Sequence, residues 1–252
     1  MNILSFLKDN VVFLDGGMGT LLQSEGLKPG EHPELWNLSN RETIQKIHQS
    51  YYEAGSNVVS ANTFGANILK FSEEELEEII AAAIENVKIA RDRADAKQPK
   101  FVALDIGPTG KLLKPYGDFD FEEAAEVFAK TVKIGAKYGA DLVLIETMND
   151  SYETKAALLA VKENCDLPVF VSNAYGEDGK LMTGASPEAM CAMLEGMGAD
   201  AIGVNCSLGP KQLSGVVKKL LKCASVPILL KPNAGLPKSV DGKTVYDVLA
   251  DE

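Results

Sequence analysis

The segment Leu142-Val143-Leu144-Ile145-Glu146-Thr147 places a carboxylate and a hydroxyl directly after four apolar residues. A short apolar run of this kind is typical of a strand that is buried on both faces. Six further runs have the same character, and their average spacing of about 36 residues leaves room for a helix after each strand. The predicted strands are Val11–Leu14, Val58–Ala61, Phe101–Leu104, Leu142–Ile145, Val169–Val171, Ala201–Val204 and Val226–Leu230.

A polar side chain follows every one of these runs. A doubly wound sheet would gather polar strand ends only near its switch point, whereas a parallel barrel brings all of them to one face. We therefore expect an α/β fold, a (βα)8 TIM-type barrel with its ligand site at that face. The residues at the strand ends are Asp15, Asn62-Thr63, Asp105, Glu146-Thr147, Asn173, Asn205-Cys206 and Asn233.

The strand count stops one short of a complete barrel. Only 22 residues follow Leu230; residues 235–243 are typical of a long loop and residues 246–252 of the start of a helix. Phe6-Leu7 or Val245–Leu249 could serve as an eighth strand, but neither has the pattern of the other seven. We expect a single domain over residues 1–252, truncated after the seventh strand and lacking its C-terminal βα unit.

Helix boundaries fall where this scheme needs them. Ser39–Glu42 and Ser72–Glu75 have the spacing of capping boxes, and Ser186-Pro187 offers an N-cap followed by proline at the first helical position. Gly55 and Gly198 are placed to end helices just before the next strand.

Composition excludes several classes of function. The 252 residues include 25 Lys and Arg against 36 Asp and Glu, a formal net charge of −11, which disfavours nucleic acid and anionic membranes as partners. No run approaches the roughly 20 apolar residues of a membrane helix, and the opening residues lack the features of a secretory leader, so we expect a cytoplasmic protein. Four cysteines are too few for a disulfide scaffold.

Two acidic residues are candidates for binding a ligand's amino group. Asp15 precedes Gly16 and Gly17, whose backbone N–H groups could hold an anion, so the turn suits a zwitterion such as an amino acid. Glu146 needs a cation or hydrogen-bond donors, either from a structural ion pair or from an ammonium clamp shared with Asp15. The turn is no dinucleotide fingerprint, because Leu22 stands where the third glycine would be.

Other reactive side chains give weaker signals. Cys206 ends a strand, whereas Cys165, Cys191 and Cys223 fall on predicted helices and receive no role. His32 and His48 are poorly placed as general bases, which argues against Ser-His or Cys-His hydrolysis. An aldolase or lyase using a Schiff base on the lysine at position 231 is a further alternative, although no phosphate-binding motif accompanies it.

Six motifs in order resemble the homocysteine S-methyltransferase family, most closely the homocysteine-binding module of cobalamin-dependent methionine synthases. The resemblance covers nearly the whole chain. The motifs are Leu14–Thr20, Asn62–Gly65, Asp105–Gly110, Glu146-Thr147, Gly203–Pro210 and Pro232–Gly235.

This resemblance implies both a substrate site and a metal site. Asp15 and Glu146 match positions that bind the homocysteine amino group, and Gly16, Gly17 and Thr63 lie where its carboxylate is held. Family members hold zinc with three cysteines, of which only Cys206 is present in this chain, and Asn233 matches a position whose side chain can approach the metal. The implied reaction is methyl transfer from methylcobalamin to a zinc-bound homocysteine thiolate, giving methionine; a zinc-bound thiol is deprotonated.

Because two cysteine ligands are absent, we expect this chain alone to bind zinc weakly and to be inactive. Other modules of the full-length protein would bind cobalamin and methyltetrahydrofolate. Alternatives are a cobalamin-independent enzyme that uses betaine or S-methylmethionine, and a non-catalytic homocysteine-binding scaffold. Unpaired barrel edges also predict self-association.

Overall fold

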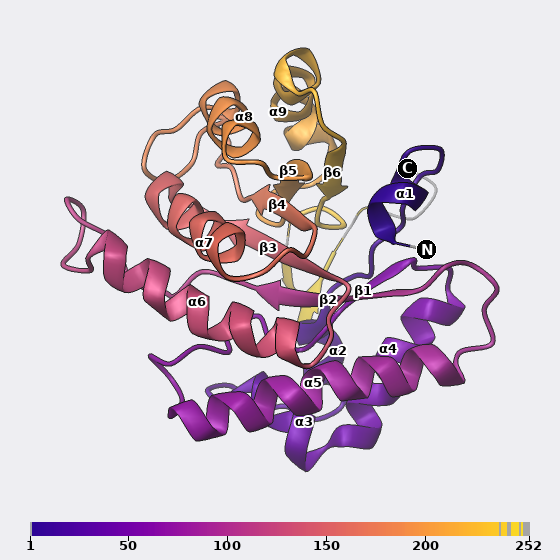
Figure 1. Ribbon diagram of the computed structural model, residues 1–252. Coiled ribbons are helices and arrows are strands. Elements are labelled where there is room, and N and C mark those ends of the chain that lie inside the picture. The colour runs from indigo at the N-terminus through magenta and orange to yellow at the C-terminus, as the bar shows by residue number, and fades with distance from the viewer. Residues whose placement is uncertain (1, 237, 241–242, 247, 249–252) are drawn as a thin grey trace.

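The computed structural model describes residues 2–236, 238–240, 243–246 and 248. Its centre is one parallel sheet in which the strands neighbour one another in chain order, and the sheet curls as it proceeds (Figure 1). This arrangement is consistent with an incomplete TIM barrel. The strands are β1 Val58–Ser60, β2 Phe101–Ile106, β3 Leu142–Met148, β4 Val169–Asn173, β5 Ala201–Asn205 and β6 Ile228–Lys231.

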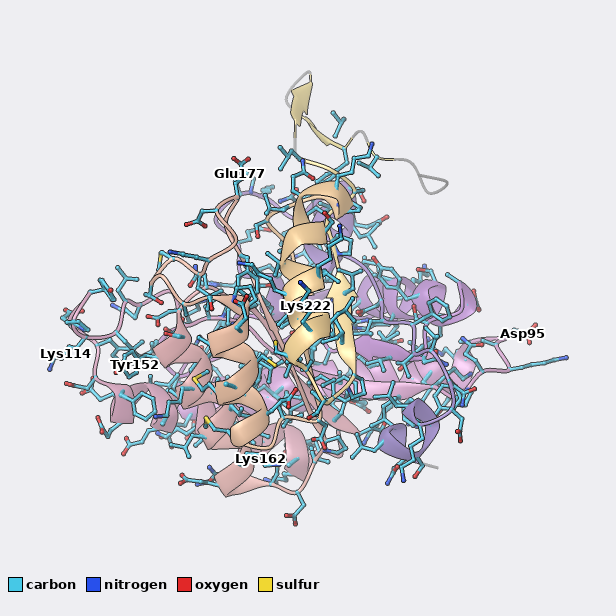
Figure 2. The ribbon with its side chains drawn as sticks, turned by 90° about the horizontal axis from the view of Figure 1, so that it is seen from above. Asp95, Lys114, Tyr152, Lys162, Glu177 and Lys222 are labelled. Carbon is cyan, nitrogen blue, oxygen red and sulfur yellow. The ribbon has the colours of Figure 1, made fainter. Side chains whose placement is uncertain are left out.

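Helices alternate with the strands and cover the outer face of the sheet (Figure 1). Figure 2 shows the molecule from above, with Lys222 on the outward side of α9 and with Asp95 and Lys114 at opposite edges of the view. The helices are α1 Ile3–Leu7, α2 Met18–Ser24, the 3-10 turn η1 Pro33–Leu35, α3 Trp36–Ser39, α4 Arg41–Glu53, α5 Glu73–Arg93, α6 Phe121–Lys137, α7 Ser151–Asn164, α8 Pro187–Gly196 and α9 Pro210–Cys223.

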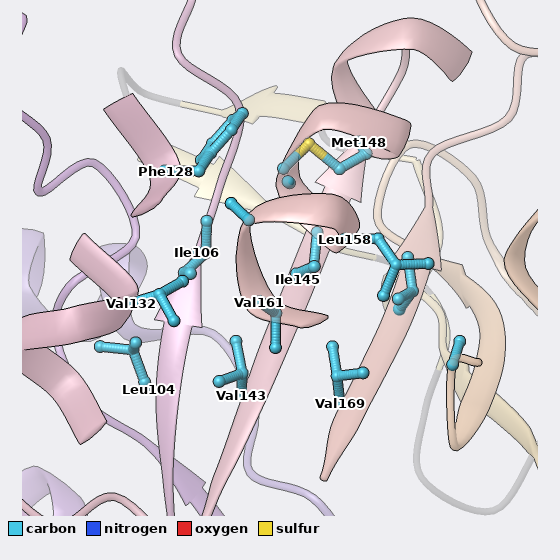
Figure 3. Packing of buried hydrophobic residues seen from close by; sticks show 14 of the residues in the cluster. Leu104, Ile106, Phe128, Val132, Val143, Ile145, Met148, Leu158, Val161 and Val169 are labelled. Carbon is cyan, nitrogen blue, oxygen red and sulfur yellow. The ribbon is translucent and has the colours of Figure 1, made fainter. Parts of the chain in front are cut away.

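Alternate residues of each strand enter two different apolar cores, because successive strand side chains point to opposite faces. In β3, Val143 and Ile145 face outward into the larger core, where they meet side chains of α6 and α7 such as Val132 and Val161 (Figure 3). Leu142 and Leu144 face inward into a smaller core, which α1 fills with Ile3. Both faces of the sheet are therefore buried over β1 to β5, as the apolar runs predict, whereas in the edge strand β6 Leu230 is 53% exposed.

The predicted helix boundaries are confirmed except for one. Ser72 and Glu75 form a capping box at the start of α5, and Ser186 caps α8. Gly55 and Gly198 adopt left-handed φ angles of 111° and 82° after α4 and α8. The prediction at Ser39 is wrong: Ser39 ends α3 and its hydroxyl donates to a carbonyl in its own turn, and α4 begins after Asn40.

The predicted first strand is much shorter than expected. Residues 11–14 run alongside β1, but only Leu14 forms a ladder bridge, a parallel one with Val58. Val11 and Phe13 are 74% and 63% exposed, because no strand of the described residues lies on their other side. Within the described residues the sheet therefore has six strands plus this bridge, where seven strands were predicted.

The segment predicted as a loop contains a short hairpin. β7 Lys238–Val240 and β8 Lys243–Val245 pair in an antiparallel manner apart from the main sheet. The helix predicted from Tyr246 onward lies mostly outside the described residues. An apolar groove of about 440 Å³ runs between β6 and residues 11–14, the two sides between which the sheet remains open.

Candidate active site

The inward alternation of the strands delivers charged side chains to one end of the inner face. Along each strand, the inward-facing residues are apolar at the start and polar at the carboxyl end. In β2 the series ends at Asp105, in β3 at Glu146, and in β6 Leu229 is followed two residues later by Lys231. These three ionisable groups therefore meet at the carboxyl end of the sheet, opposite α1.

A cavity of about 170 Å³ lies at this end. It brings together Asp15, Glu146 and Cys206, which the sequence assigns to a single site, and it also includes Gly16, Gly17 and Asn233 from the predicted set. The full lining is Asp15, Gly16, Gly17, Met18, Ser60, Ala61, Asn62, Phe64, Asp105, Glu146, Cys206, Lys231, Pro232 and Asn233.

Asp15 is held rigidly by the end of β1. The backbone N–H of Ser60 donates to its Oδ2 at 2.7 Å, and the Ser60 hydroxyl donates to its Oδ1 at 3.1 Å. Burial raises the pKa of Asp15 to about 6, against the opposing effects of Lys231 and of these hydrogen bonds. The carboxylate is thus held at the cavity wall, and its pKa is raised toward neutral pH.

Lys231 occupies the space between the two predicted clamp residues. Its Nζ lies 2.8 Å from Oε2 of Glu146 and 3.6 Å from Oδ1 of Asp15. Burial alone would lower the pKa of Lys231, but the charges of Glu146, Asp15 and Asp105 outweigh it and the pKa is raised. A lysine held as ammonium is a poor nucleophile, which argues against the Schiff-base alternative.

Asp105 is a third carboxyl group in the same cavity. It is 7% exposed, and its Oδ1 has no hydrogen-bond partner among the described residues. Burial, followed by the negative charge of Glu146, raises its pKa well above the ordinary value. Neither Asp105 nor Lys231 belongs to the predicted binding set, although the two-residue alternation from Ala103 and Leu229 could have identified both.

Cys206 is positioned by a hydrogen-bond network between β3 and β5. The Asn205 side chain accepts from the Thr147 N–H at 2.9 Å, donates to the Thr147 hydroxyl at 2.7 Å, and accepts from the Ser172 hydroxyl at 2.8 Å. The Thr147 Oγ1 and Asn205 Nδ2 atoms lie 3.7 and 3.6 Å from the Cys206 sulfur, so two donors face it.

The backbone is strained at the same place. Thr147, Cys206 and Ser207 have φ angles of 60°, 57° and 52°, in the left-handed region that costs residues other than glycine about 1–2 kcal/mol. Such outliers gather at sites where a side chain must point in a particular direction. Here they turn the chain at the ends of β3 and β5, beside the cavity.

The glycine turn and Thr63 occupy different positions relative to the cavity. Gly16 and Gly17 line it, and a Cβ at Gly16 would lie 2.9 Å from the hydroxyl of Tyr51, which donates to the Gly17 carbonyl. Thr63 is fully buried beneath the lining, where its hydroxyl donates to the Asp105 carbonyl and accepts from the Asp105 N–H. Its side chain is therefore engaged with β2.

Metal-binding side chains are sparse in the described part of the chain. No group of three or more His, Cys, Asp or Glu residues there has the arrangement of a metal site. Cys206 and Asn233 line the cavity, whereas Cys165, Cys191 and Cys223 lie at or within helices α7, α8 and α9. Among the same residues, no helix combines the length and the apolar character needed to cross a bilayer.

Comparison with known sequences identifies long relatives. The methionine synthase of Mycobacterium leprae (strain TN) is 31% identical over 100% of this chain, and that of Mycobacterium tuberculosis (strain ATCC 25618 / H37Rv) is 29% identical over the same extent. The chain spans only 22% of the length of either relative.

Solved structures share the fold. The homocysteine methyltransferase MmuM from Escherichia coli in its metallated form superposes with a TM-score of 0.79 at 22% identity, covering 92% of this chain and 86% of that one. The carboxyl transferase domain of Rhizobium etli pyruvate carboxylase superposes with a TM-score of 0.53 at 17% identity, covering 88% and 36% of the two chains. The sequence profile of homocysteine S-methyltransferases matches residues 12–252, and the chain belongs to that family.

Proposed function

We propose that this chain is the homocysteine-binding module of a methyltransferase of the methionine synthase type. The observation that carries the proposal is the single cavity that contains both the Asp15 and Glu146 carboxylates and the Cys206 sulfur. An α-amino acid with a side-chain thiol has two groups that need these two features: an ammonium for the carboxylates and a sulfur for the metal centre.

Each residue then has a defined task. Asp15 and Glu146 bind the amino group of homocysteine, since both are largely buried and acceptor-rich. The N–H groups at Gly16 and Gly17 hold its carboxylate together with Thr63, whose hydroxyl is bonded to the Asp105 backbone in this structure. The reaction is acceptance of a methyl group from methylcobalamin to give methionine. The cobalamin-binding and folate-binding modules would lie in the remaining length that the methionine synthase relatives have.

The residues present fit a zinc ion only in part. Cys206 offers one sulfur and Asn233 one amide oxygen, whereas a zinc site for thiol alkylation needs more protein ligands than these. Zinc, when bound, supplies a deprotonated thiol at neutral pH. We infer that the missing thiolates must come from outside residues 1–252, so that this chain alone binds zinc weakly and transfers no methyl group.

The open groove supports a related proposal about assembly. We propose that residues 1–252 act as a single barrel domain that lacks one strand–helix unit. The sheet is open between β6 and residues 11–14, where such a unit would pair. Unpaired strand edges of this kind favour pairing with another chain. We expect self-association, which light scattering over a concentration series measures; a strictly monomeric species at all concentrations contradicts it.

Calorimetric titration with homocysteine, with and without zinc, tests the proposed function. We expect binding by the wild-type chain that Glu146→Gln weakens at least tenfold, since a charged hydrogen bond to the amino group contributes about 1.5–3 kcal/mol. Glu188→Gln on α8, outside the cavity, is the matched control and should bind as the wild type does. Absence of binding by the folded wild-type chain overturns the proposal. Adding methylcobalamin, betaine or S-methylmethionine to the full-length protein then identifies the methyl donor.

A further inference from the structure

The predicted ammonium clamp already contains an ammonium group. Nζ of Lys231 contacts Glu146 at 2.8 Å and Asp15 at 3.6 Å, in the cavity that also contains Cys206. A ligand's amino group placed between the two carboxylates would occupy this same position. The lysine and the proposed substrate group therefore compete for one place.

Lys231 is the most exposed of the three side chains in this cluster, and Asp15 is the most firmly held. The Asp15 side chain is 5% exposed and is anchored by two hydrogen bonds from Ser60, and the Glu146 side chain is 12% exposed. The Lys231 side chain is 21% exposed, so its flexible stem has a route toward solvent. The lysine is therefore the member of the cluster that can leave.

The backbone of Lys231 is held by bonds that do not involve its side chain. Its carbonyl accepts a hydrogen bond from the Cys206 N–H at 3.2 Å, and its strand pairs in register with β5. Movement of the ammonium thus requires rotation about side-chain bonds only, and the position of Cys206 is preserved.

The charges explain why such a lysine is useful. If both the ligand and the Lys231 ammonium were absent, the carboxyl groups of Asp15, Glu146 and Asp105 would share a buried cavity with no cation. Such an arrangement is strongly unfavourable. Lys231 balances part of this charge in the empty site. An incoming α-amino acid brings an ammonium group of the same charge and similar donor geometry, so the exchange keeps a cation between the Asp15 and Glu146 carboxylates.

We propose that Lys231 is a tethered substitute for the ligand's amino group, which holds the clamp in the empty site and is displaced when an amino-acid ligand binds. The inference rests on the proposed function and adds that Lys231 competes with the substrate. Its removal therefore strengthens ligand binding, although Lys231 lies within the site.

Affinity measurements with Lys231→Met test this competition, because methionine keeps most of the stem without the charge. When Lys231 lies between the two carboxylates in about 90% of ligand-free molecules, its removal makes homocysteine bind about tenfold more tightly. Lys231→Arg retains the cation and should not gain affinity. Lys222→Met on the outward side of α9 is the control for loss of one positive charge (Figure 2). Weaker homocysteine binding by a folded Lys231→Met chain overturns the inference, because the lysine would then be a direct ligand contact.

A second measurement uses the wild-type chain, so the test does not depend on the stability of the variant. The NMR signal of the Lys231 ε-methylene, assigned by its loss in Lys231→Arg, should shift when homocysteine is added. The analogue 4-mercaptobutanoate lacks the amino group and should leave the signal in place. Homocysteine binding with an unchanged signal, or an equal shift with the analogue, overturns the displacement. Failure of both wild-type and Lys231→Met chains to bind homocysteine overturns the proposed function itself.

Discussion

Asn205 and Thr147 exchange two hydrogen bonds between the ends of β5 and β3, at 2.9 and 2.7 Å, and the Cys206 sulfur lies within 3.7 Å of both side chains. This pair connects two strands that are not neighbours in the sheet, since β4 lies between them. It also involves Thr147 in a left-handed conformation. The position of the sulfur is therefore set by contacts from several elements.

Replacement of Asn205 by alanine should destabilise the fold and release Cys206. The Thr147 N–H and the Ser172 hydroxyl would lose their acceptor in a buried place, which costs about 1–3 kcal/mol. Urea unfolding measures the loss. Asn164→Ala, which removes one hydrogen bond at the end of α7, is the control and should cost less. Equal losses in the two variants would show that the Asn205 hydrogen bonds contribute no more to the free energy of unfolding than the single hydrogen bond of Asn164 does.

Zinc binding by this chain should be weak and should depend on Cys206. Metal analysis after gel filtration is expected to find well under one zinc per chain, and Cys206→Ser should remove what remains, because the thiolate is the strongest ligand in the cavity. Cys165→Ser, at the end of α7, serves as the control. Stoichiometric zinc that survives chelation would contradict this expectation.

Gly203→Ala should be among the most damaging small substitutions. A Cβ at Gly203 would lie 1.8 Å from the carbonyl oxygen of Leu229 in the adjacent strand, so β5 and β6 would have to separate. We expect a loss of about 3 kcal/mol, since overpacking against backbone cannot relax easily. Gly215→Ala in α9 has nothing within 4 Å of its Cβ and should instead gain about 0.5–1 kcal/mol. Thermal unfolding of the two variants decides between these signs.

His48 should make the fold sensitive to acid. Burial lowers its pKa from 6.5 to about 3, and neither ring nitrogen has a hydrogen-bond partner among the described residues. Below pH 6.5 the unfolded chain binds a proton at His48 that the folded chain does not. The free energy of unfolding therefore decreases as the pH is lowered. His48→Leu should remove about 3 kcal/mol of the loss between pH 7 and pH 4. His48→Gln should also remove it, but at lower stability because a buried amide is left unpaired. A pH profile parallel to wild type in both variants would contradict the assignment.

Asp15 should give the opposite dependence. Its folded pKa of about 6 lies above the ordinary value of 3.8, so the folded chain holds the proton more tightly than the unfolded chain does. This stabilisation is complete below pH 3.8 and is lost as the pH rises through about 6, a change of roughly 3 kcal/mol that Asp15→Asn should abolish. Because only ionised Asp15 attracts an ammonium, homocysteine binding should weaken below pH 6 in wild type. Denaturant unfolding and calorimetry at matched pH values measure both effects.

Much of the fold could be predicted from alternating apolar runs and polar strand ends. Residues 11–14 were predicted as a full strand because their composition is that of a strand. A full strand there would also need a partner on the side away from β1, and β6 does not pair with it. The hairpin at β7 and β8 was predicted as a loop, although Asp241-Gly242 between two Val-containing segments is a turn signal.

The site was predictable as a location and less so as a set of contacts. Asp15, Glu146, Cys206 and Asn233 were identified because strand ends converge, and the cavity brings them together. The ion pair of Lys231 with Glu146 depends on how far a side chain reaches across the sheet, which strand spacing in the sequence does not reveal. Thr63 illustrates the same limit, since its hydroxyl is engaged with Asp105.

Damaging variants are to be expected far from the cavity as well as on its rim. Ile3 of α1 is 1% exposed at the base of the inner core, and a short stretch of chain leads from it to Leu14, which packs in the same core, and on to Asp15. A genetic screen for impaired ligand recognition should therefore also recover alleles at Ile3. An amino-terminal fusion partner that crowds this small helix would act in the same way.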